Sequence, residues 1–254
     1  MLGARVRLRA CCLPPIHASL AVTEPVPRAV DSAPELPLLG FWPRIGAWLN
    51  MLFVDHSIFR FFFNLRQAVA PGVYRSSHPM PYQLRRGARA GVKTVLNLRG
   101  AEAHIGSNRL EWDTAQRCGL MVVHFPLGSR DAPAAEEVLG LVQAFETLEY
   151  PLWFHCKSGA DRAGFVAAVY QLVCAGKPLA EARRELRFWW HGHVRQAKTG
   201  ILDHFLDCYE AEFKRDGIGF VDWLRTRYDR DAVRRSFREQ WWAAMFVDRV
   251  LHRE

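Results

Sequence analysis

The sequence predicts an α/β fold, with a mainly parallel central sheet flanked by helices and a helical C-terminal extension. Three observations lead to this fold class. Short apolar runs of strand length alternate with helical patterns between residues 70 and 176. Glycines close the helical patterns at 91, 119 and 176. After Leu179 only helical patterns follow. Strands that alternate with helices form βαβ units, in which helices cover both faces of a parallel sheet.

The first elements of this pattern are two strands and two helices. A short strand begins at Val73, and the prolines that follow it mark a turn. Residues 81–91 form a helical pattern that ends at a glycine, the usual residue after a helix. The apolar, partly β-branched run 92–98 is typical of a buried strand. A second helix is expected over 109–118, again followed by a glycine.

The later elements repeat the alternation. Residues 120–127 predict a strand and residues 128–135 a loop. The helix that follows carries its apolar residues on one face. A further strand over 151–155 is apolar on both sides, and an apolar helix over 162–175 comes after it. Helices joined by glycine turns fill the remainder.

We expect three segments along the chain. Residues 1–36 carry several prolines and no clean periodicity, which predicts a loosely ordered extension. Residues 37–213 are expected to form the α/β domain, and residues 214–254 a helical extension packed on it. Three arginines near the start resemble a basic leader, but Pro14 and Pro15 interrupt the apolar stretch, so a secretory signal is not expected.

Composition excludes several classes of protein. Half of the 254 residues are apolar, which excludes a disordered chain. The net charge of +8 favours an anionic partner, but no nucleic-acid-binding motif accompanies it, so a nucleic-acid partner is not expected. The six cysteines form no Cys-x-x-Cys pair, which indicates free thiols in a reducing compartment. We therefore expect a cytoplasmic protein.

Residues 38–63 are strongly apolar and aromatic. Pro43, Arg44 and Asp55 interrupt them, so a membrane-spanning helix is not predicted. A helix that packs on the domain is the favoured interpretation, and peripheral contact with a membrane surface is the alternative.

The segment that carries chemistry runs from His155 to Gly164. It follows a buried strand and opens an apolar helix, and five residues separate Cys156 from Arg162 within it. A loop of this length can turn its backbone N–H groups toward one centre, where they bind a phosphate-sized anion and hold Cys156 as a thiolate. The Arg162 guanidinium would grip two phosphoryl oxygens, and Gly159 would allow a positive φ. A thiolate beneath a phosphoryl group is placed for in-line attack.

This arrangement resembles the cysteine-dependent protein tyrosine and dual-specificity phosphatase superfamily, whose signature is His-Cys-x5-Arg. A second motif supports the resemblance: Tyr74-Arg75-Ser76-Ser77-His78-Pro79 followed by residues 91–99 is similar to the early strand, helix and strand of the dual-specificity branch. The resemblance covers about residues 70–176 and implies a phosphatase-like fold, a phosphocysteine intermediate and no cofactor or metal. It implies that the loop residues bind substrate: Lys157, Ser158, Gly159, Ala160, Asp161 and Arg162.

The resemblance also calls for a general acid on a loop upstream of the nucleophile. Asp131 lies 25 residues before Cys156, in the loop after the predicted strand 120–127, and is the favoured candidate. Asp161, inside the cysteine loop, is the second candidate. One departure concerns Ala163, because the family usually has Ser or Thr at this position. The absence of that hydroxyl group predicts slower hydrolysis of the phosphoenzyme.

Other residues near this loop receive supporting roles. Arg75 and Ser76 are expected to brace the cysteine loop from behind, and His155 to orient it. Lys198 is a further candidate for the pocket. His191 and His193 lack a nearby third metal ligand, so a structural turn is favoured over a metal site.

The function expected from these residues is hydrolysis of phosphate monoesters on proteins, at phosphotyrosine or phosphoserine and phosphothreonine. Lys157, the positive charge and the aromatic segment keep a phosphoinositide substrate open. A phosphate-binding module without turnover and a sulfurtransferase are the alternatives from other classes, although the loop of a sulfurtransferase generally lacks an arginine at this position.

Overall fold

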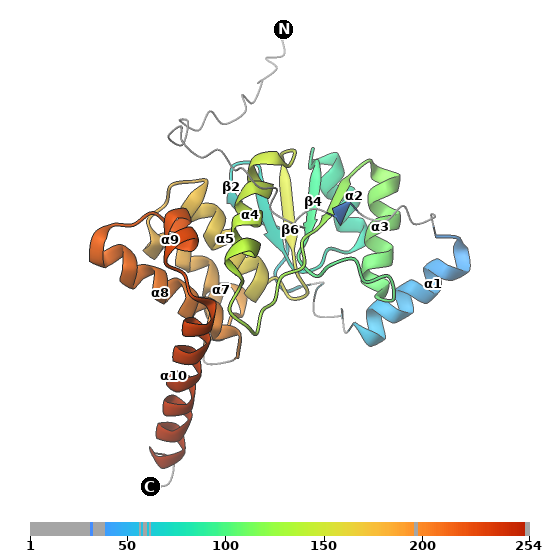
Figure 1. Ribbon diagram of the computed structural model, residues 1–254. Helices are drawn as coiled ribbons and strands as arrows, with labels where there is room; N and C mark the ends of the chain where they lie inside the picture. The colour runs from blue at the N-terminus through green and yellow to red at the C-terminus, as the bar shows by residue number, and fades with distance from the viewer. Residues whose placement is uncertain are drawn as a thin grey trace, which may run out of the picture.

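The computed structural model describes residues 31–32, 39–55, 57, 60, 62–195 and 198–251. Apart from residues 31–32, the extension expected over residues 1–36 lies outside this described part. The prediction of an α/β protein is confirmed: helices flank one sheet whose central strands are parallel, as Figure 1 shows. In the described part of the chain, no helix is long and apolar enough to cross a membrane.

The sheet has six strands in the order β1-β5-β4-β6-β3-β2. The four inner strands β5, β4, β6 and β3 are parallel, and the two edge strands are antiparallel to their neighbours. The strands are β1 (Asp31–Ser32), β2 (Gln67–Ala70), β3 (Val73–Ser76), β4 (Thr94–Asn97), β5 (Met121–His124) and β6 (Leu152–His155). Every residue of β4 and β6 is buried, as expected for strands covered on both faces.

The strand register brings the carboxyl ends of the parallel strands into one row. Ser76 of β3 and Asn97 of β4 both pair with His155 of β6, and Asn97 also pairs with His124 of β5. The loops that leave these strands therefore emerge at one edge of the sheet, where ligands of parallel sheets bind. Cys156 is the first residue of the loop after β6.

Two groups of helices cover the two faces of the sheet (Figure 1). Buried residues of α2 and α3 pack with Val95 and Trp153 on one face, whereas those of α4 and α5 pack with Leu96 and Phe154 on the other. The helices are α1 (Phe41–Leu49), α2 (Pro81–Arg89), α3 (Gly106–Cys118), α4 (Ala135–Thr147), α5 (Asp161–Val173), α6 (Leu179–Ala182), α7 (Phe188–His191), α8 (Ile201–Asp216), α9 (Phe220–Thr226) and α10 (Arg230–Leu251).

The C-terminal helices join the larger core cluster. Phe205 of α8 is fully buried, and its ring packs against Phe165 of α5, Trp223 of α9 and Tyr228. The first turns of α10 lie against α8, and the rest of α10 extends away from the sheet (Figure 1). This aromatic cluster ties the helices after residue 200 to the helix that begins with the cysteine loop.

The sequence pattern did not reveal the edge strand β2, and it only partly described residues 38–63. Within that segment, α1 and the π-helical turn Asn50–Val54 contact α3. Ala47 and Met51 are buried beside Met80 and Leu110. The outer face remains exposed, and its large apolar side chains are Phe41, Trp42, Leu49, Phe53 and Val54.

Candidate active site

The cysteine loop joins the buried strand β6 to helix α5. Cys156 is 2% exposed, and its Sγ accepts a hydrogen bond from the Gly159 backbone N–H at 3.2 Å. Helix α5 begins at Asp161, so the first N–H groups of the helix lie at the end of the same loop and have no acceptor within the helix. The thiol is thus held where loop and helix N–H groups favour negative charge.

Gly159 adopts a conformation that only glycine accommodates easily. Its φ is +76°, and a Cβ at this position would lie 2.5 Å from the Ser77 backbone nitrogen. Ser77 belongs to the segment after β3, so the backbone of the cysteine loop packs directly against the end of this neighbouring strand. The sequence-based expectation of a positive φ at mid-loop agrees with this geometry.

Arg75 braces the cysteine loop from behind. Its Nη2 donates to the Gly159 carbonyl at 2.5 Å and to the Ala160 carbonyl at 3.3 Å. Its Nη1 binds Glu185 at 2.6 Å, so the buried guanidinium is held on both sides. The charges of Arg75 and of buried Arg60 both interact electrostatically with Cys156.

Arg162 stands in the first turn of α5, and its Nη1 donates to the Leu98 carbonyl at the end of β4, at 3.2 Å. Within the described residues, no carboxylate forms an ion pair with Arg162. The guanidinium is therefore fixed on one side by a neutral acceptor, and its remaining donors can take an anion.

Asp55 links the aromatic N-terminal segment to the cysteine loop, a role the sequence did not reveal. This buried carboxylate accepts hydrogen bonds from Arg60 at 2.7 Å, Arg99 at 2.8 and 2.9 Å, and Ser107 at 2.5 Å. Burial opposes its ionisation, but the bonds from Arg99 and Ser107 outweigh it and lower the pKa of Asp55. Lys157 Nζ lies 3.3 Å from Asp55 Oδ1, so the Asp55 carboxylate partly balances the positive charge of Lys157.

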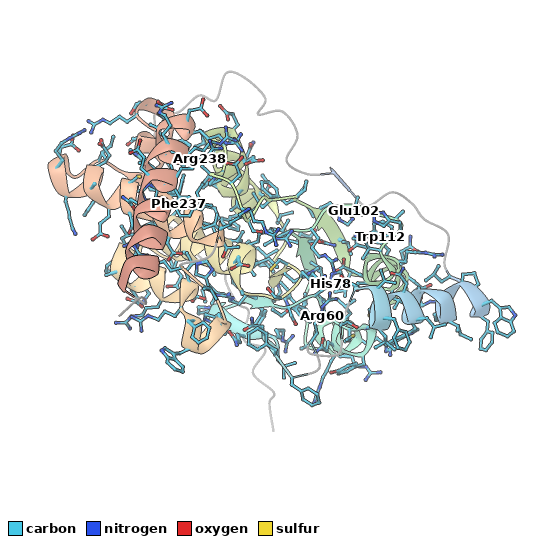
Figure 2. The ribbon with its side chains drawn as sticks, turned by 90° about the horizontal axis from the view of Figure 1, so that it is seen from below. Arg60, His78, Glu102, Trp112, Phe237 and Arg238 are labelled. Carbon is cyan, nitrogen blue, oxygen red and sulfur yellow. The ribbon has the colours of Figure 1, made fainter. Side chains whose placement is uncertain are left out.

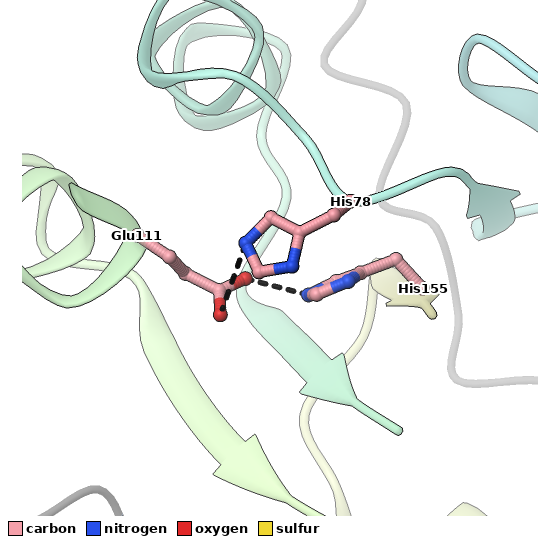
Figure 3. A group of neighbouring side chains, drawn as sticks. All are labelled: His78, Glu111 and His155. Carbon is pink, nitrogen blue, oxygen red and sulfur yellow. Dashed lines mark hydrogen bonds and ion pairs between the residues drawn. The ribbon is translucent and has the colours of Figure 1, made fainter. Parts of the chain in front are cut away.

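A second buried network orients His155, the residue before Cys156. His155 Nε2 lies 2.6 Å from Glu111 Oε1, and Figure 3 shows Glu111 reaching from α3 toward both His155 and His78. Asn97 donates to the other oxygen of Glu111 at 2.7 Å. The expected orienting role of His155 is consistent with this contact, and Glu111 is its partner.

These three residues also have the composition of a metal site, since their ligand atoms lie within 4.8 Å of one another. Arg99 donates to His78 Nδ1 at 3.1 Å, which places the hydrogen of His78 on Nε2, the atom nearest Glu111. Burial lowers the pKa of His78, followed by the charges of His155 and Arg99. A nitrogen that carries its hydrogen cannot ligate a cation, so the group fits a hydrogen-bond network better than a metal.

Asp161 is engaged on the far side of the cysteine loop. Its Oδ1 lies 2.6 Å from Nδ1 of His193, whose Nε2 lies 2.5 Å from Asp203 of α8. Burial alone would lower the pKa of His193, but the two carboxylates raise it to about 9. His193 is thus a buried imidazolium that ties the cysteine loop to α8, at a place where the sequence favoured a structural turn over a metal site.

Asp131, the favoured acid candidate, forms its ion pairs with α10. Both of its oxygens accept from Arg234, and Oδ2 also lies 3.2 Å from Arg230. These contacts, first the hydrogen bonds from Arg234, lower the pKa of Asp131. Among the described residues, no hydrogen bond or ion pair joins Asp131 to the loop 155–162. Cys156 and Arg162 lie at the two ends of the cysteine loop, whereas Asp131 is held in an ion pair with Arg234.

The buried strand, the thiol held by a loop N–H and the arginine that opens the next helix define the class of cysteine-dependent phosphatases. A family model described as DSP-PTPase phosphatase fused to NAD+ kinase matches residues 73–199, which is half of the chain. The chain belongs to this family of dual-specificity-type phosphatases.

Similar proteins are found among curated sequences and solved structures. Dual specificity protein phosphatase TpbA of Pseudomonas aeruginosa (strain UCBPP-PA14) is 32% identical over 147 residues, which are 57% of this chain and 60% of TpbA. The crystal structure of Tk-PTP in the active form is 25% identical, with a TM-score of 0.45 over 56% of this chain and 96% of that one. A crystal structure of P. aeruginosa TpbA in complex with pTyr is 23% identical, with a TM-score of 0.47 over 63% and 93%.

Proposed function

We propose that this protein hydrolyses phosphate monoesters through a phosphocysteine intermediate, with phosphorylated protein side chains as the substrate. The observation that carries the proposal is the pairing of a buried thiol held by a loop N–H with an arginine that has no carboxylate partner in the described part of the chain. Membership of the dual-specificity-type family supports the same reaction. The absence of any disulfide among the described cysteines suits a reducing, cytoplasmic setting.

In the first step, the Cys156 sulfur attacks phosphorus and the bond from phosphorus to the ester oxygen breaks. Arg162 and the loop N–H groups hold the phosphoryl oxygens, whose charge increases in the transition state. The leaving oxygen takes a proton from the general acid. Water then attacks the phosphocysteine, gives its proton to the same carboxylate, and inorganic phosphate leaves as the thiolate returns.

We assign the general acid to Asp131 rather than to Asp161. Asp161 lies 2.6 Å from the His193 imidazolium, which holds it against the segment before α8, and its side chain is only 25% exposed. Asp131 lies at the partly exposed end of the loop after β5, which leaves the same sheet edge as the cysteine loop. To act as an acid, Asp131 must leave its ion pair with Arg234 and contact the leaving oxygen of the substrate instead.

Hydrolysis of para-nitrophenyl phosphate by the full chain tests the nucleophile. Cys156→Ser is expected to lower kcat by about 10³-fold or more. Cys174→Ser is the matched control, because burial raises the pKa of Cys174 to about 12 and keeps that thiol neutral. Undiminished hydrolysis by Cys156→Ser would contradict the mechanism, and no hydrolysis by the wild type would favour a binding module. Persulfide formation from thiosulfate without phosphatase activity would favour a sulfurtransferase.

Asp131→Ala tests the acid. With alkyl phosphates, whose leaving groups need a proton, we expect a loss of about 10²-fold, and a much smaller loss with para-nitrophenyl phosphate. Asp161→Asn should not reproduce this dependence on the leaving group. An equal loss on both substrates for Asp131→Ala would refute the assignment.

A phosphoinositide is the second candidate substrate, favoured by the exposed aromatic face of α1. Phe41 is 71% exposed and Trp42 is 76% exposed, and such side chains suit the interface of a membrane. A substrate panel of phosphopeptides against phosphoinositide vesicles distinguishes the two classes. Phe41→Ser/Trp42→Ser should reduce vesicle binding and turnover of the lipid only if this second candidate is correct.

A further inference from the structure

A cavity of about 470 Å³ lies between the Asp131 loop, the beginning of α8 and the helix α10. Its polar wall consists of Arg130, Asp131, Lys198, Arg234 and Arg238. No residue of the cysteine loop 155–162 lines it, and Asp131, the proposed general acid, is the one residue that it shares with the site proposed for phosphate-ester hydrolysis.

The charges around this cavity are unbalanced. Arg234 contributes one cation, and it is neutralised by Asp131, the only carboxylate in the described wall. Arg130, Lys198 and Arg238 form no ion pair with any carboxylate in the ranges the structure describes. Three uncompensated cations on one concave surface repel one another, and the resulting positive potential attracts an anion.

The cations come from three different parts of the chain. Arg130 belongs to the loop after β5, Lys198 to the turn before α8, and Arg238 to α10, one helical turn after Arg234. Figure 2 shows Arg238 and Phe237 on α10, well separated in that view from Arg60 and His78 beside the cysteine loop. A solvated face of a single helix would not surround a cavity in this way.

We propose that this cavity is a second anion-binding site, and that its ligand is a compact small molecule with two or more phosphate groups. Its volume falls within the range of small-molecule sites, which is about 300–1,000 Å³. Arginine side chains bind phosphate oxygens in pairs, and Lys198 adds a point charge. The three cations come from three different elements, and a molecule with linked phosphates presents oxygens to more than one of them.

The site needs no turnover and no part of the cysteine loop. Its existence therefore does not depend on the proposed function, and binding can be measured in a protein that cannot react. Tripolyphosphate is a suitable probe because it carries linked phosphates, and inorganic phosphate is the single-group comparison.

Isothermal titration of tripolyphosphate into the full-length Cys156→Ser protein tests the proposal. We expect two binding sites, one in the cysteine loop and one in the cavity. Arg162→Ala should remove the first and leave the second. Lys198→Ala/Arg238→Ala should remove the second, with affinity lowered about tenfold or more for each cation lost. In the cavity, inorganic phosphate should bind at least about tenfold more weakly than tripolyphosphate.

The matched control is Lys93→Ala/Arg235→Ala, which removes the same charge from exposed positions outside the cavity. It should leave both sites unchanged. A single site that survives Lys198→Ala/Arg238→Ala and disappears with Arg162→Ala would overturn the proposal. Equal weakening by the control would also overturn it, since the effect would then reflect net charge. If only one site is found, and Lys198→Ala/Arg238→Ala removes it while Arg162→Ala does not, the cavity site stands and anion binding by the cysteine loop is contradicted.

Discussion

Raising the pH through the titration of His193 should loosen the connection between the cysteine loop and α8. The imidazole has no exposed side-chain surface and lies between the carboxylates of Asp161 and Asp203, at 2.6 and 2.5 Å. These contacts need the charged imidazolium, because a neutral ring can donate only one of the two hydrogen bonds. Deprotonation therefore breaks one contact and leaves a carboxylate facing a bare nitrogen.

The magnitude follows from the pKa of His193, about 9 in the folded protein against an ordinary value of 6.5. This difference corresponds to about 3 kcal/mol of unfolding free energy. Because the folded pKa is raised, the contribution is complete below pH 6.5, shrinks above that pH, and is lost as the pH rises through about 9.

Urea unfolding of the wild type and His193→Gln at pH 6.5, 8 and 9.5 measures this contribution. We expect the wild type to lose about 3 kcal/mol more than His193→Gln between the first and last pH. His191→Gln is the control two residues away. Burial, followed by the charge of Arg75, lowers the pKa of His191 to about 4, so its ring is neutral across the whole range. This control should keep the pH dependence of the wild type.

The decisive comparison is between the pH dependence of the unfolding free energy in the wild type and in His193→Gln. If the unfolding free energies of wild type and His193→Gln fall in parallel between pH 6.5 and 9.5, His193 is not an imidazolium held by two carboxylates in the folded state. The same difference in slope for His191→Gln would show that the effect belongs to the segment and not to this ring.

Three further substitutions test other parts of the structure. Arg234→Ala removes the hydrogen bonds that lower the pKa of Asp131, so the pH above which kcat on alkyl phosphates falls should move upward; an unchanged pH profile would count against Asp131 as the acid. Gly159→Ala forces a Cβ to 2.5 Å from the Ser77 nitrogen at a φ of +76°, so we expect about 1–3 kcal/mol less stability in urea and at least tenfold lower kcat, and wild-type kinetics would refute the loop geometry. Phe205→Ala opens a space in the aromatic cluster and should cost about 3–5 kcal/mol in a single unfolding transition, whereas an unchanged midpoint would show that α8 contributes little to the core.

The local pattern of the chain sufficed for the fold class and for the cysteine loop. The run 92–98 contains β4 and the run 151–155 contains β6, because fully buried strands need continuous apolar residues. The five residues between Cys156 and Arg162 form a loop that closes on itself, and such a local constraint is visible in the sequence. The expected contact of Arg75 with this loop also agrees with its bonds to Gly159 and Ala160.

The partners of the charged side chains required the tertiary structure. Asp55 lies in an apolar segment with no local sign of its role, yet it forms ion pairs with Arg60, Arg99 and Lys157. Asp131 meets Arg234 across 103 residues of chain. Sequence patterns record which residues a helix or strand buries, but ion pairs form between elements whose approach depends on how the whole chain packs. The sequence by itself therefore indicated the cysteine loop, and only the packing of segments that are distant in the chain decided which charges surround it.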